Sequence, residues 1–292
     1  MRIIELSDHP AEMLNEAALR RRQAADRARS EYERALNEHE MRLRALREER
    51  DRALARRRWW LWVRRVLAVS REKRRAPRPA SLARDTVAGD GPTDREEMLM
   101  AGIEGERQVA ADLGRALDDD WTLLHGYRNR RGEIDHLLLG PRGLFAIEVK
   151  NLNATVHIRR DDWWYDKYDR YGNLVESGEI TDRRGRSPSQ QLGQPARELE
   201  AFLRDRGQAV QVQRVVALTH RRSRIGTCTD PTVRVGISAA YVLRLVDAEP
   251  AALDGRQLAQ IARLIQRDHD HHKVRRPAAG RRPPVSRRHT AG

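Results

Sequence analysis

The 292-residue sequence contains a single cysteine, Cys228, and no long uninterrupted run of apolar residues. One cysteine excludes an internal disulfide framework and suits a reducing compartment. No basic stretch followed by a long apolar one opens the chain, so we expect no secretory signal and a cytoplasmic location, where association with the nucleoid is one option. The most apolar segment, residues 59–69, is interrupted by two arginines and is shorter than the roughly 20 apolar residues that a spanning helix needs. It is therefore not expected to cross a bilayer.

Three further patterns are missing from the sequence. There is no internal repeat, no glycine-rich phosphate-binding loop and no Cys/His spacing typical of a zinc site. These absences argue against solenoid architectures, P-loop nucleotide hydrolases and structural zinc modules.

Glycine and proline are absent from residues 11–58, which are rich in Ala, Arg, Glu and Leu. This composition predicts a long, basic, solvated helix. Heptad-like spacing connects a seam of residues that arginines interrupt: Tyr32, Leu36, His39, Leu43, Leu46 and Ala53. Two interpretations stay open, a coiled-coil homodimer and a single amphipathic helix laid on the core or on DNA.

Shifts in composition predict four segments along the chain. Residues 1–75 form a basic helical arm, and residues 76–97 form a linker rich in proline and glycine. Residues 98–270 form the folded domain, and residues 271–292 form a basic tail expected to be disordered.

The net charge is +14 and the isoelectric point is about 10.8, which favours a polyanionic partner such as nucleic acid or an anionic membrane surface. Basic clusters flank the tryptophan-rich segment around Trp59, Trp60 and Trp62. These rings could stack on unpaired bases, lie at a lipid interface, or pack against the core or a dimer mate. Packing is the interpretation that we favour from the sequence.

Residues 132–150 read as a β-hairpin that carries acids and a lysine. Two apolar runs flank Gly140–Gly143, whose glycines and proline suit a tight connection. If Leu139 pairs with Leu144, Asp135 lies opposite Glu148, and strand alternation places Lys150 on the same face.

Two interpretations of this hairpin compete. The simpler one is a salt-bridged polar edge. Against it, Glu148 is embedded among apolar residues, where an unpaired carboxylate would be costly. Two opposed carboxylates also repel one another unless a cation neutralises them. We therefore favour a metal site with phosphodiester chemistry.

Strands alternating with helices through the folded domain predict a mixed α/β sheet flanked by helices and preceded by the long basic helical arm. Helices are expected over residues 94–117 and 188–206, and strands over residues 121–127 and 211–218.

Four segments in this order resemble the nuclease-related domain (NERD) family of the PD-(D/E)xK nuclease superfamily. They are residues 102–106, residues 132–136, residues 145–151 and residues 187–191. The resemblance covers about residues 98–222, and it implies a restriction-endonuclease-like fold. Position by position, it implies that Asp135 and Glu148 bind Mg²⁺ or Mn²⁺, with the Val149 carbonyl as a further ligand.

The resemblance also implies roles for side chains around the metal. Lys150 would orient or deprotonate the attacking water and stabilise the charged phosphorane. Glu106 would assist the metal directly or through water, and Gln191, with Gln190 as its rival, would position Lys150 or a phosphate. The family usually has Asn where this chain has Ser187, but serine also caps helices well.

The resulting hypothesis is a Mg²⁺-dependent nuclease that acts on DNA in processing, repair or defence. The alternative is a nucleic-acid-binding or scaffold protein whose nuclease-like domain has little or no activity. A homodimer through the N-terminal helix and contact with a membrane surface are further partner hypotheses, of which membrane contact is the less favoured.

Overall fold

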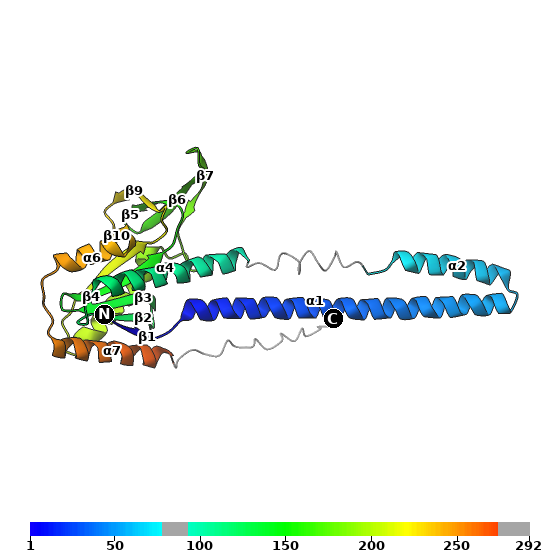
Figure 1. Ribbon diagram of the computed structural model, residues 1–292, viewed down its shortest axis with the longest axis horizontal. Coiled ribbons are helices and arrows are strands. Elements are labelled where there is room, and N and C mark those ends of the chain that lie inside the picture. Colours follow the sequence, from blue (N-terminus) through cyan, green and yellow to red (C-terminus); the bar gives the residue numbers. More distant parts are fainter. Residues whose placement is uncertain (78–92, 274–292) are drawn as a thin grey trace, which may run out of the picture. The chain divides into compact units, whose positions relative to one another are not determined.

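The computed structural model describes residues 1–77 and 93–273. The predicted linker 76–97 therefore lies mainly outside the described residues, and so does nearly all of the predicted tail 271–292. The chain divides into two compact units (Figure 1). The first comprises residues 1–10 and the chain from residue 101 onward, and the second comprises residues 11–100.

A six-stranded mixed sheet forms the centre of the first unit, in the order β1-β2-β3-β4-β8-β10. Its strands are β1 (Arg2–Glu5), β2 (Thr122–Asn129), β3 (Gly132–Gly140), β4 (Gly143–Lys150), β8 (Val212–Leu218) and β10 (Arg234–Ile237). The β2-β3-β4 meander is antiparallel, whereas β1 pairs with β2, β8 with β4 and β10 with β8 in parallel.

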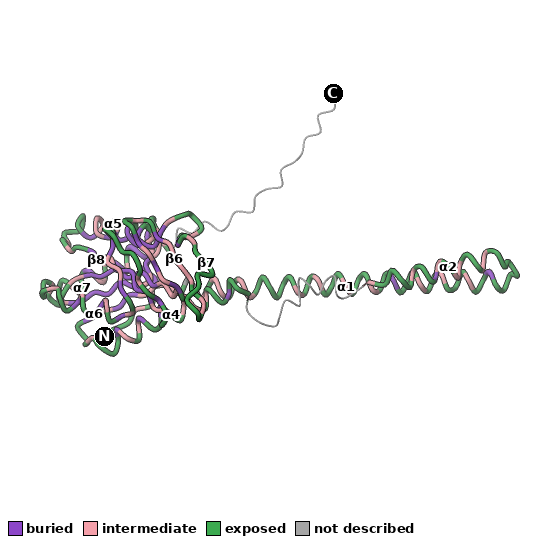
Figure 2. Tube along the Cα trace, turned by 90° about the horizontal axis from the view of Figure 1, so that it is seen from above, coloured by how far each residue is buried: buried purple, intermediate pink, exposed green. Residues whose placement is uncertain are grey.

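Helices cover both faces of this sheet: α4 (Asp94–Ala116), α5 (Pro188–Arg204), α6 (Ser238–Ala248) and α7 (Gly255–Lys273). The residues of α4 and α6 pack with one set of alternate strand residues, while α5 and α7 pack with the other set. The buried chain is concentrated in the central strands (Figure 2). Burial on both faces explains why β3 and β4 read as nearly continuous apolar runs. The predicted mixed sheet flanked by helices is confirmed.

A second sheet in the same unit has the order β7-β6-β5-β9. Its strands are β5 (Thr155–Arg159), β6 (Asp162–Tyr168), β7 (Leu174–Glu179) and β9 (Arg224–Thr229). Its edge strand β7 is largely exposed. The connections that lead into and out of this sheet carry the chain from β4 to α5 and from β8 to β10.

The first residues differ from the prediction of a purely helical arm. Residues 2–5 form β1, which pairs with β2 from Arg2 opposite Thr122 to Glu5 opposite His125. The partner strand lies more than 100 residues away in the sequence. A four-residue strand has too little local pattern to be told from a helix start without that partner.

The second unit contains α1 (His9–Ala55) and α2 (Trp59–Arg74). The long N-terminal helix is confirmed, and α2 runs back along its C-terminal half (Figure 1). The seam residue His39 is buried and its Nδ1 lies 3.4 Å from Glu72 Oε1 of α2, so part of the heptad-like seam meets a helix of the same chain.

The tryptophans of α2 were expected to pack against the core or a dimer mate, and two of them are not covered within the described part of this chain, so that packing against a dimer mate stays a prediction for these two. Trp59 and Trp60 are 65% and 63% exposed. The sequence shows that α2 is apolar but not which of its sides is covered. Among the described residues, no helix combines the length and apolarity needed to cross a membrane.

Candidate active site

The β3–β4 hairpin has the register that the sequence predicts, with Leu139 opposite Leu144. The paired ladder runs from Gly140 and Gly143 to His136 and Ile147. At the next position the Asp135 side chain takes over from the backbone, because the Val149 N–H donates to Asp135 Oδ2 at 2.7 Å. Asp135 is therefore tied to the strand position next to Glu148.

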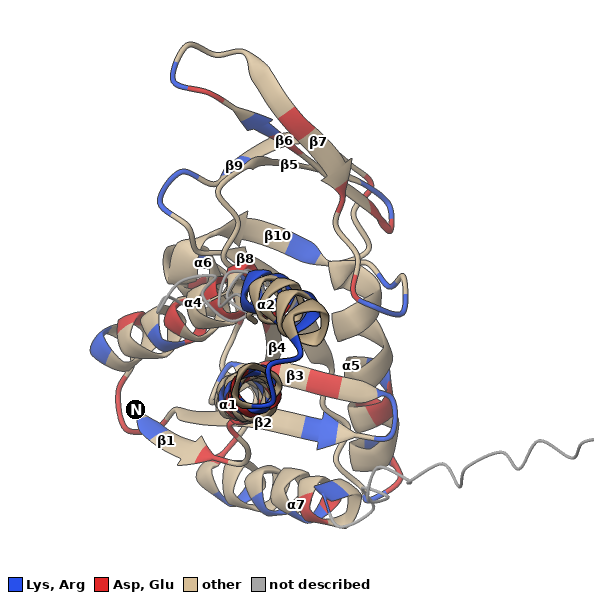
Figure 3. Cartoon of the chain, turned by 90° about the vertical axis from the view of Figure 1, so that its right-hand side faces the viewer, with Lys and Arg blue, Asp and Glu red and all other residues tan. Residues whose placement is uncertain are grey.

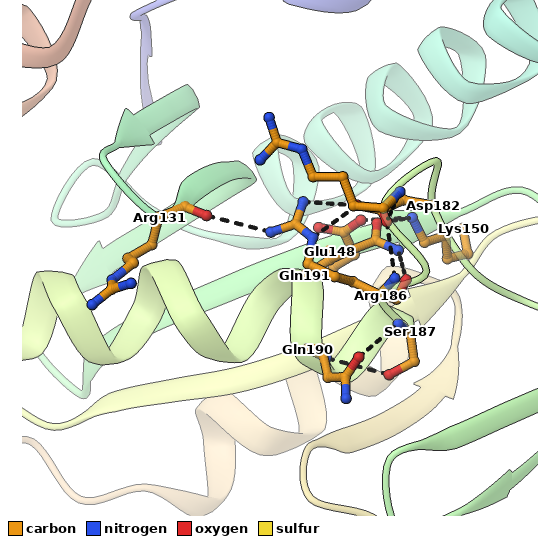
Figure 4. Close-up of polar contacts among 9 residues, drawn as sticks. Arg131, Glu148, Lys150, Asp182, Arg186, Ser187, Gln190 and Gln191 are labelled. Atoms are coloured by element: carbon orange, nitrogen blue, oxygen red, sulfur yellow. Dashed lines mark hydrogen bonds and ion pairs between the residues drawn. The ribbon is translucent and has the colours of Figure 1, made fainter.

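Glu148 and Lys150 project from β4 on the side of the sheet that α5 covers, since alternate residues of β4 pack with the α5 and α7 core. Glu148 is 5% exposed. The Lys150 ammonium donates to Glu148 Oε1 at 2.7 Å and to Gln191 Oε1 at 3.1 Å (Figure 4). One lysine thus links the strand carboxylate to the start of α5.

The N-terminus of α5 determines which of the two glutamines reaches Lys150. The Ser187 hydroxyl accepts from the Gln190 N–H, and the Gln190 side chain accepts from the Ser187 N–H at 3.1 Å, which forms a capping box. The side chain of Gln190 is therefore engaged in the helix cap. Gln191 instead faces Lys150, and its Nε2 donates to the Arg186 carbonyl at 2.8 Å (Figure 4).

Arg186 lies at the edge of the same site. Its guanidinium contacts Asp182 Oδ2 at 2.9 Å through Nε and at 2.7 Å through Nη2, and its Nη1 donates to the Arg131 carbonyl at 3.3 Å. In the loop before α5, Arg186 lines the pocket whereas Arg183 and Arg184 are exposed.

Glu106 reaches the site from α4, on the other side of the sheet. The helix approaches closely at Gly105, where an added Cβ would come within 2.7 Å of Thr219 Oγ1 and 3.1 Å of the Asn151 side chain. The Asn151 amide also donates to the Ala101 carbonyl at 2.7 Å. Glycine at this position lets α4 pack closely against the ends of the strands, which places Glu106 at the site.

These side chains surround a pocket of about 180 Å³. Its lining consists of Glu106, His125, Gly126, Glu133, Asp135, Glu148, Arg186 and Gln191. Four carboxylates therefore face one guanidinium, with the Lys150 ammonium behind them. Such an excess of negative charge in a half-buried pocket favours a bound cation.

The charges perturb one another strongly. Burial, and after it the Glu148 and Glu133 carboxylates, raises the pKa of Glu106 to about 8. Burial, followed by Glu148 and Glu106, also raises the pKa of Asp135 well above its ordinary value. Burial lowers the pKa of the Lys150 ammonium, but Glu148 and Asp135 outweigh it, so the pKa of Lys150 ends above its ordinary value.

Two histidines connect Glu106 to the sheet. His136 follows Asp135 in β3 and therefore lies on the opposite face of the strand, and burial followed by the neighbouring His125 lowers its pKa to about 3. Its Nε2 lies 3.1 Å from the Glu106 carbonyl, which can only accept, so the neutral ring donates there. Its Nδ1 then accepts from His125 Nδ1 at 3.1 Å, and His125 Nε2 faces Glu106 Oε2 at 3.6 Å.

The sequence interpretation missed His125 and Glu133. Glu133 is two residues before Asp135 on the same strand face, and it accepts from Arg128 Nη2 at 2.7 Å and from the Ser7 hydroxyl at 3.3 Å. The period of two along β3 could have identified Glu133. His125 comes to the site only through the β2–β3 register, in which it lies opposite His136.

No three side chains of His, Cys, Asp or Glu within residues 1–77 and 93–273 are grouped so that they could hold a metal by themselves. The predicted residues Glu106, Asp135, Glu148 and Gln191 do line one pocket. Lys150 contacts two of them. A hydrated cation bound by two carboxylates is the form of site that this arrangement can accommodate.

A search of curated proteins and a search of solved structures found no match to this chain. One family model does match, that of the nuclease-related domain, over residues 101–219. The matched segment contains Glu106, the β3–β4 hairpin and Gln191, and hence every predicted site residue. The part of the chain that builds the pocket therefore matches the family model of the nuclease-related domain (NERD).

Proposed function

We propose that this domain is a metal-dependent nuclease of the PD-(D/E)xK type that hydrolyses phosphodiester bonds in DNA, in processing, repair or defence. The observation that carries the proposal is the Lys150 ammonium, 2.7 Å from Glu148 Oε1, beside Asp135 in an acid-rich pocket. The net charge of +14 supports a polyanionic substrate.

Asp135 and Glu148 would hold Mg²⁺ or Mn²⁺, with the Val149 carbonyl as a third ligand. Thr219 N–H donates to the Lys150 carbonyl, so the backbone of Lys150 faces β8. The backbone N–H and C=O groups of successive residues in a strand point alternately toward the two neighbouring strands. The backbone groups of Val149 therefore point toward β3 and Asp135, in keeping with the hydrogen bond from the Val149 N–H to Asp135. Two carboxylates and waters suffice for Mg²⁺.

When bound, Mg²⁺ would lower the pKa of a coordinated water and offset charge on the phosphate. Lys150 would orient the attacking water and stabilise the charge that develops on the phosphoryl oxygens. Its raised pKa keeps it an ammonium at neutral pH, which supports this role over that of a proton acceptor. Gln191 would hold the ammonium in place through its 3.1 Å contact.

Glu106 and Arg186 would complete the site. The Glu106 carboxyl, with a pKa of about 8, can hold or release a proton near neutral pH, and His125 Nε2 lies 3.6 Å from its Oε2. Arg186 would contact a phosphate of the substrate from the pocket rim, because its guanidinium is already oriented by Asp182.

The test is a cleavage assay on supercoiled plasmid, linear duplex, single-stranded DNA and RNA, with Mg²⁺, Mn²⁺ or EDTA. Wild type is compared with Asp135→Asn and Lys150→Ala. The control is Glu104→Gln, which changes an exposed acidic residue of α4. We expect Asp135→Asn to lose Mn²⁺ binding and cleavage together. Lys150→Ala should still bind Mn²⁺ but cleave about 100-fold more slowly or worse. Glu104→Gln should match wild type.

Equal cleavage by wild type and Asp135→Asn would overturn the assignment of the site. Nucleic-acid binding by folded wild type without cleavage in either metal would instead favour the alternative function, a nucleic-acid-binding or scaffold protein. The substrate that is cut fastest identifies the nucleic acid and the strand state.

A further inference from the structure

The helix α2 has two apolar sides, only one of which is covered within its own unit. On the covered side, Val69 is 6% exposed and Glu72 lies 3.4 Å from His39 of α1. Arg65 on this side forms an ion pair of 2.9 Å with Glu49. These contacts account for the attachment of α2 to α1.

The other side presents an aromatic and aliphatic stripe. Trp59 is 65% exposed, Trp60 63%, Val63 49% and Leu67 53%. At 3.6 residues per turn these four positions lie within about 100° of one another around the helix. Two of them belong to the first turn of α2, where the chain has just turned back from α1.

Positive charge surrounds this stripe. Residues 56–75 contain nine Lys or Arg and one acidic residue, Glu72, which is engaged with α1. Arg64 and Arg71 border the stripe on the helix surface. The connection between α1 and α2 is entirely basic, and Figure 3 shows it as a continuous blue segment.

We propose that α2 is a peripheral membrane-binding helix that docks its stripe of Trp59, Trp60, Val63 and Leu67 on an anionic phospholipid surface. Tryptophan side chains suit the depth of the lipid headgroups, and the aliphatic side chains suit the acyl boundary below them. The flanking arginines complement the negative headgroups. At 16 residues, α2 is too short and too charged to span a bilayer, so it lies in the interface.

Two other occupants fit the stripe less well. A nucleic acid would be attracted by the arginines and could stack on the tryptophans. The aliphatic side chains of Val63 and Leu67, however, provide neither a ring for stacking on a base nor a hydrogen-bond donor for a phosphate. A second copy of the chain would bring two strongly cationic surfaces together, and like charges at an interface oppose association. An anionic lipid surface satisfies both the apolar stripe and the charge.

The experiment measures co-sedimentation of the full chain with vesicles of phosphatidylcholine alone and of phosphatidylcholine with 30% phosphatidylglycerol, at low and high salt. The test variant is Trp59→Ser with Trp60→Ser, and both side chains are exposed. A matched control is Leu19→Ser with Met41→Ser, two residues of α1 that are 55% and 65% exposed. Circular dichroism checks that each variant keeps its helix content.

We expect wild type and the α1 control to bind the anionic vesicles, and the tryptophan variant to bind them at least tenfold more weakly. Arg64→Gln with Arg71→Gln should weaken binding and reduce its salt dependence. Phosphatidylcholine alone should bind poorly. Equal vesicle binding by wild type and the tryptophan variant would overturn the proposal.

Two further measurements separate the other occupants. Loss of DNA binding in the tryptophan variant with vesicle binding unchanged would assign the stripe to nucleic acid and overturn the proposal. A dimer in sedimentation equilibrium that dissociates in that variant, again with vesicle binding unchanged, would assign it to a second copy. The readouts need no cleavage, so the result is independent of the nuclease proposal.

Discussion

Glu106 should make the stability of the metal-free protein fall as the pH rises. Its pKa in the folded chain is about 8, against an ordinary value of 4.5. Between these values the folded protein holds a proton that the unfolded chain has released. Unfolding therefore releases a proton, and raising the pH across this window favours the unfolded state.

The size of the effect follows from the two pKa values. The difference between 4.5 and about 8 corresponds to about 5 kcal/mol of unfolding free energy lost across the window, at about 1.4 kcal/mol per pH unit. Asp135, whose pKa is also raised, acts in the same direction. Glu106→Gln keeps the shape of the side chain but removes its titration, so the slope should become shallower by up to about 1.4 kcal/mol per pH unit.

The measurement is urea unfolding followed by circular dichroism, in EDTA, at intervals from pH 5 to pH 8.5. Wild type and Glu106→Gln are compared with Glu104→Gln, which removes an exposed carboxylate from the same helix. The control should retain the wild-type slope. A Glu106→Gln slope equal to that of wild type, or a wild type that gains stability toward pH 8, would refute the assigned perturbation of Glu106.

Four other substitutions test the structural support of the site. Gln191→Leu should lower kcat about tenfold or more with little change in KM, because it removes a hydrogen bond to the Lys150 ammonium. Gln190→Leu should instead lower stability and leave kcat unchanged. The reverse pattern in steady-state kinetics would contradict this assignment. Ser187→Ala should cost about 1 kcal/mol in urea unfolding through loss of the α5 cap, and no loss would mean that the cap contributes nothing. Gly140→Ala should cost about 1–3 kcal/mol, since the added Cβ would lie 2.2 Å from the Trp121 ring. An unchanged melting temperature would show that the ring moves aside freely.

The hairpin of the site could be predicted because its information is local. Glycines around a tight turn set the register, and the period of two along each strand placed Asp135, Glu148 and Lys150 together. The structure added that the ladder stops one pair short of the acids and that the Asp135 carboxylate replaces a backbone acceptor. Counting residue pairs outward from the turn cannot reveal that a side-chain carboxylate replaces the backbone acceptor.

The partners of the hairpin required the tertiary structure. Gln190 and Gln191 are equivalent in the sequence, and the capping box at Ser187 is what leaves Gln191 free to meet Lys150. His125 enters the site through strand pairing with β3. Its partner Glu106 comes from a helix that Gly105 allows to approach the sheet.

The sequence by itself determined the long helix, the mixed α/β pattern and the carboxylate hairpin, because helix and strand periodicity and turn chemistry are encoded over a few neighbouring residues. Only the tertiary structure decided which faces are covered. It placed residues 2–5 in the sheet and left Trp59 and Trp60 exposed. Burial depends on partners that lie far away in the chain, and apolar character alone does not say whether a partner is present.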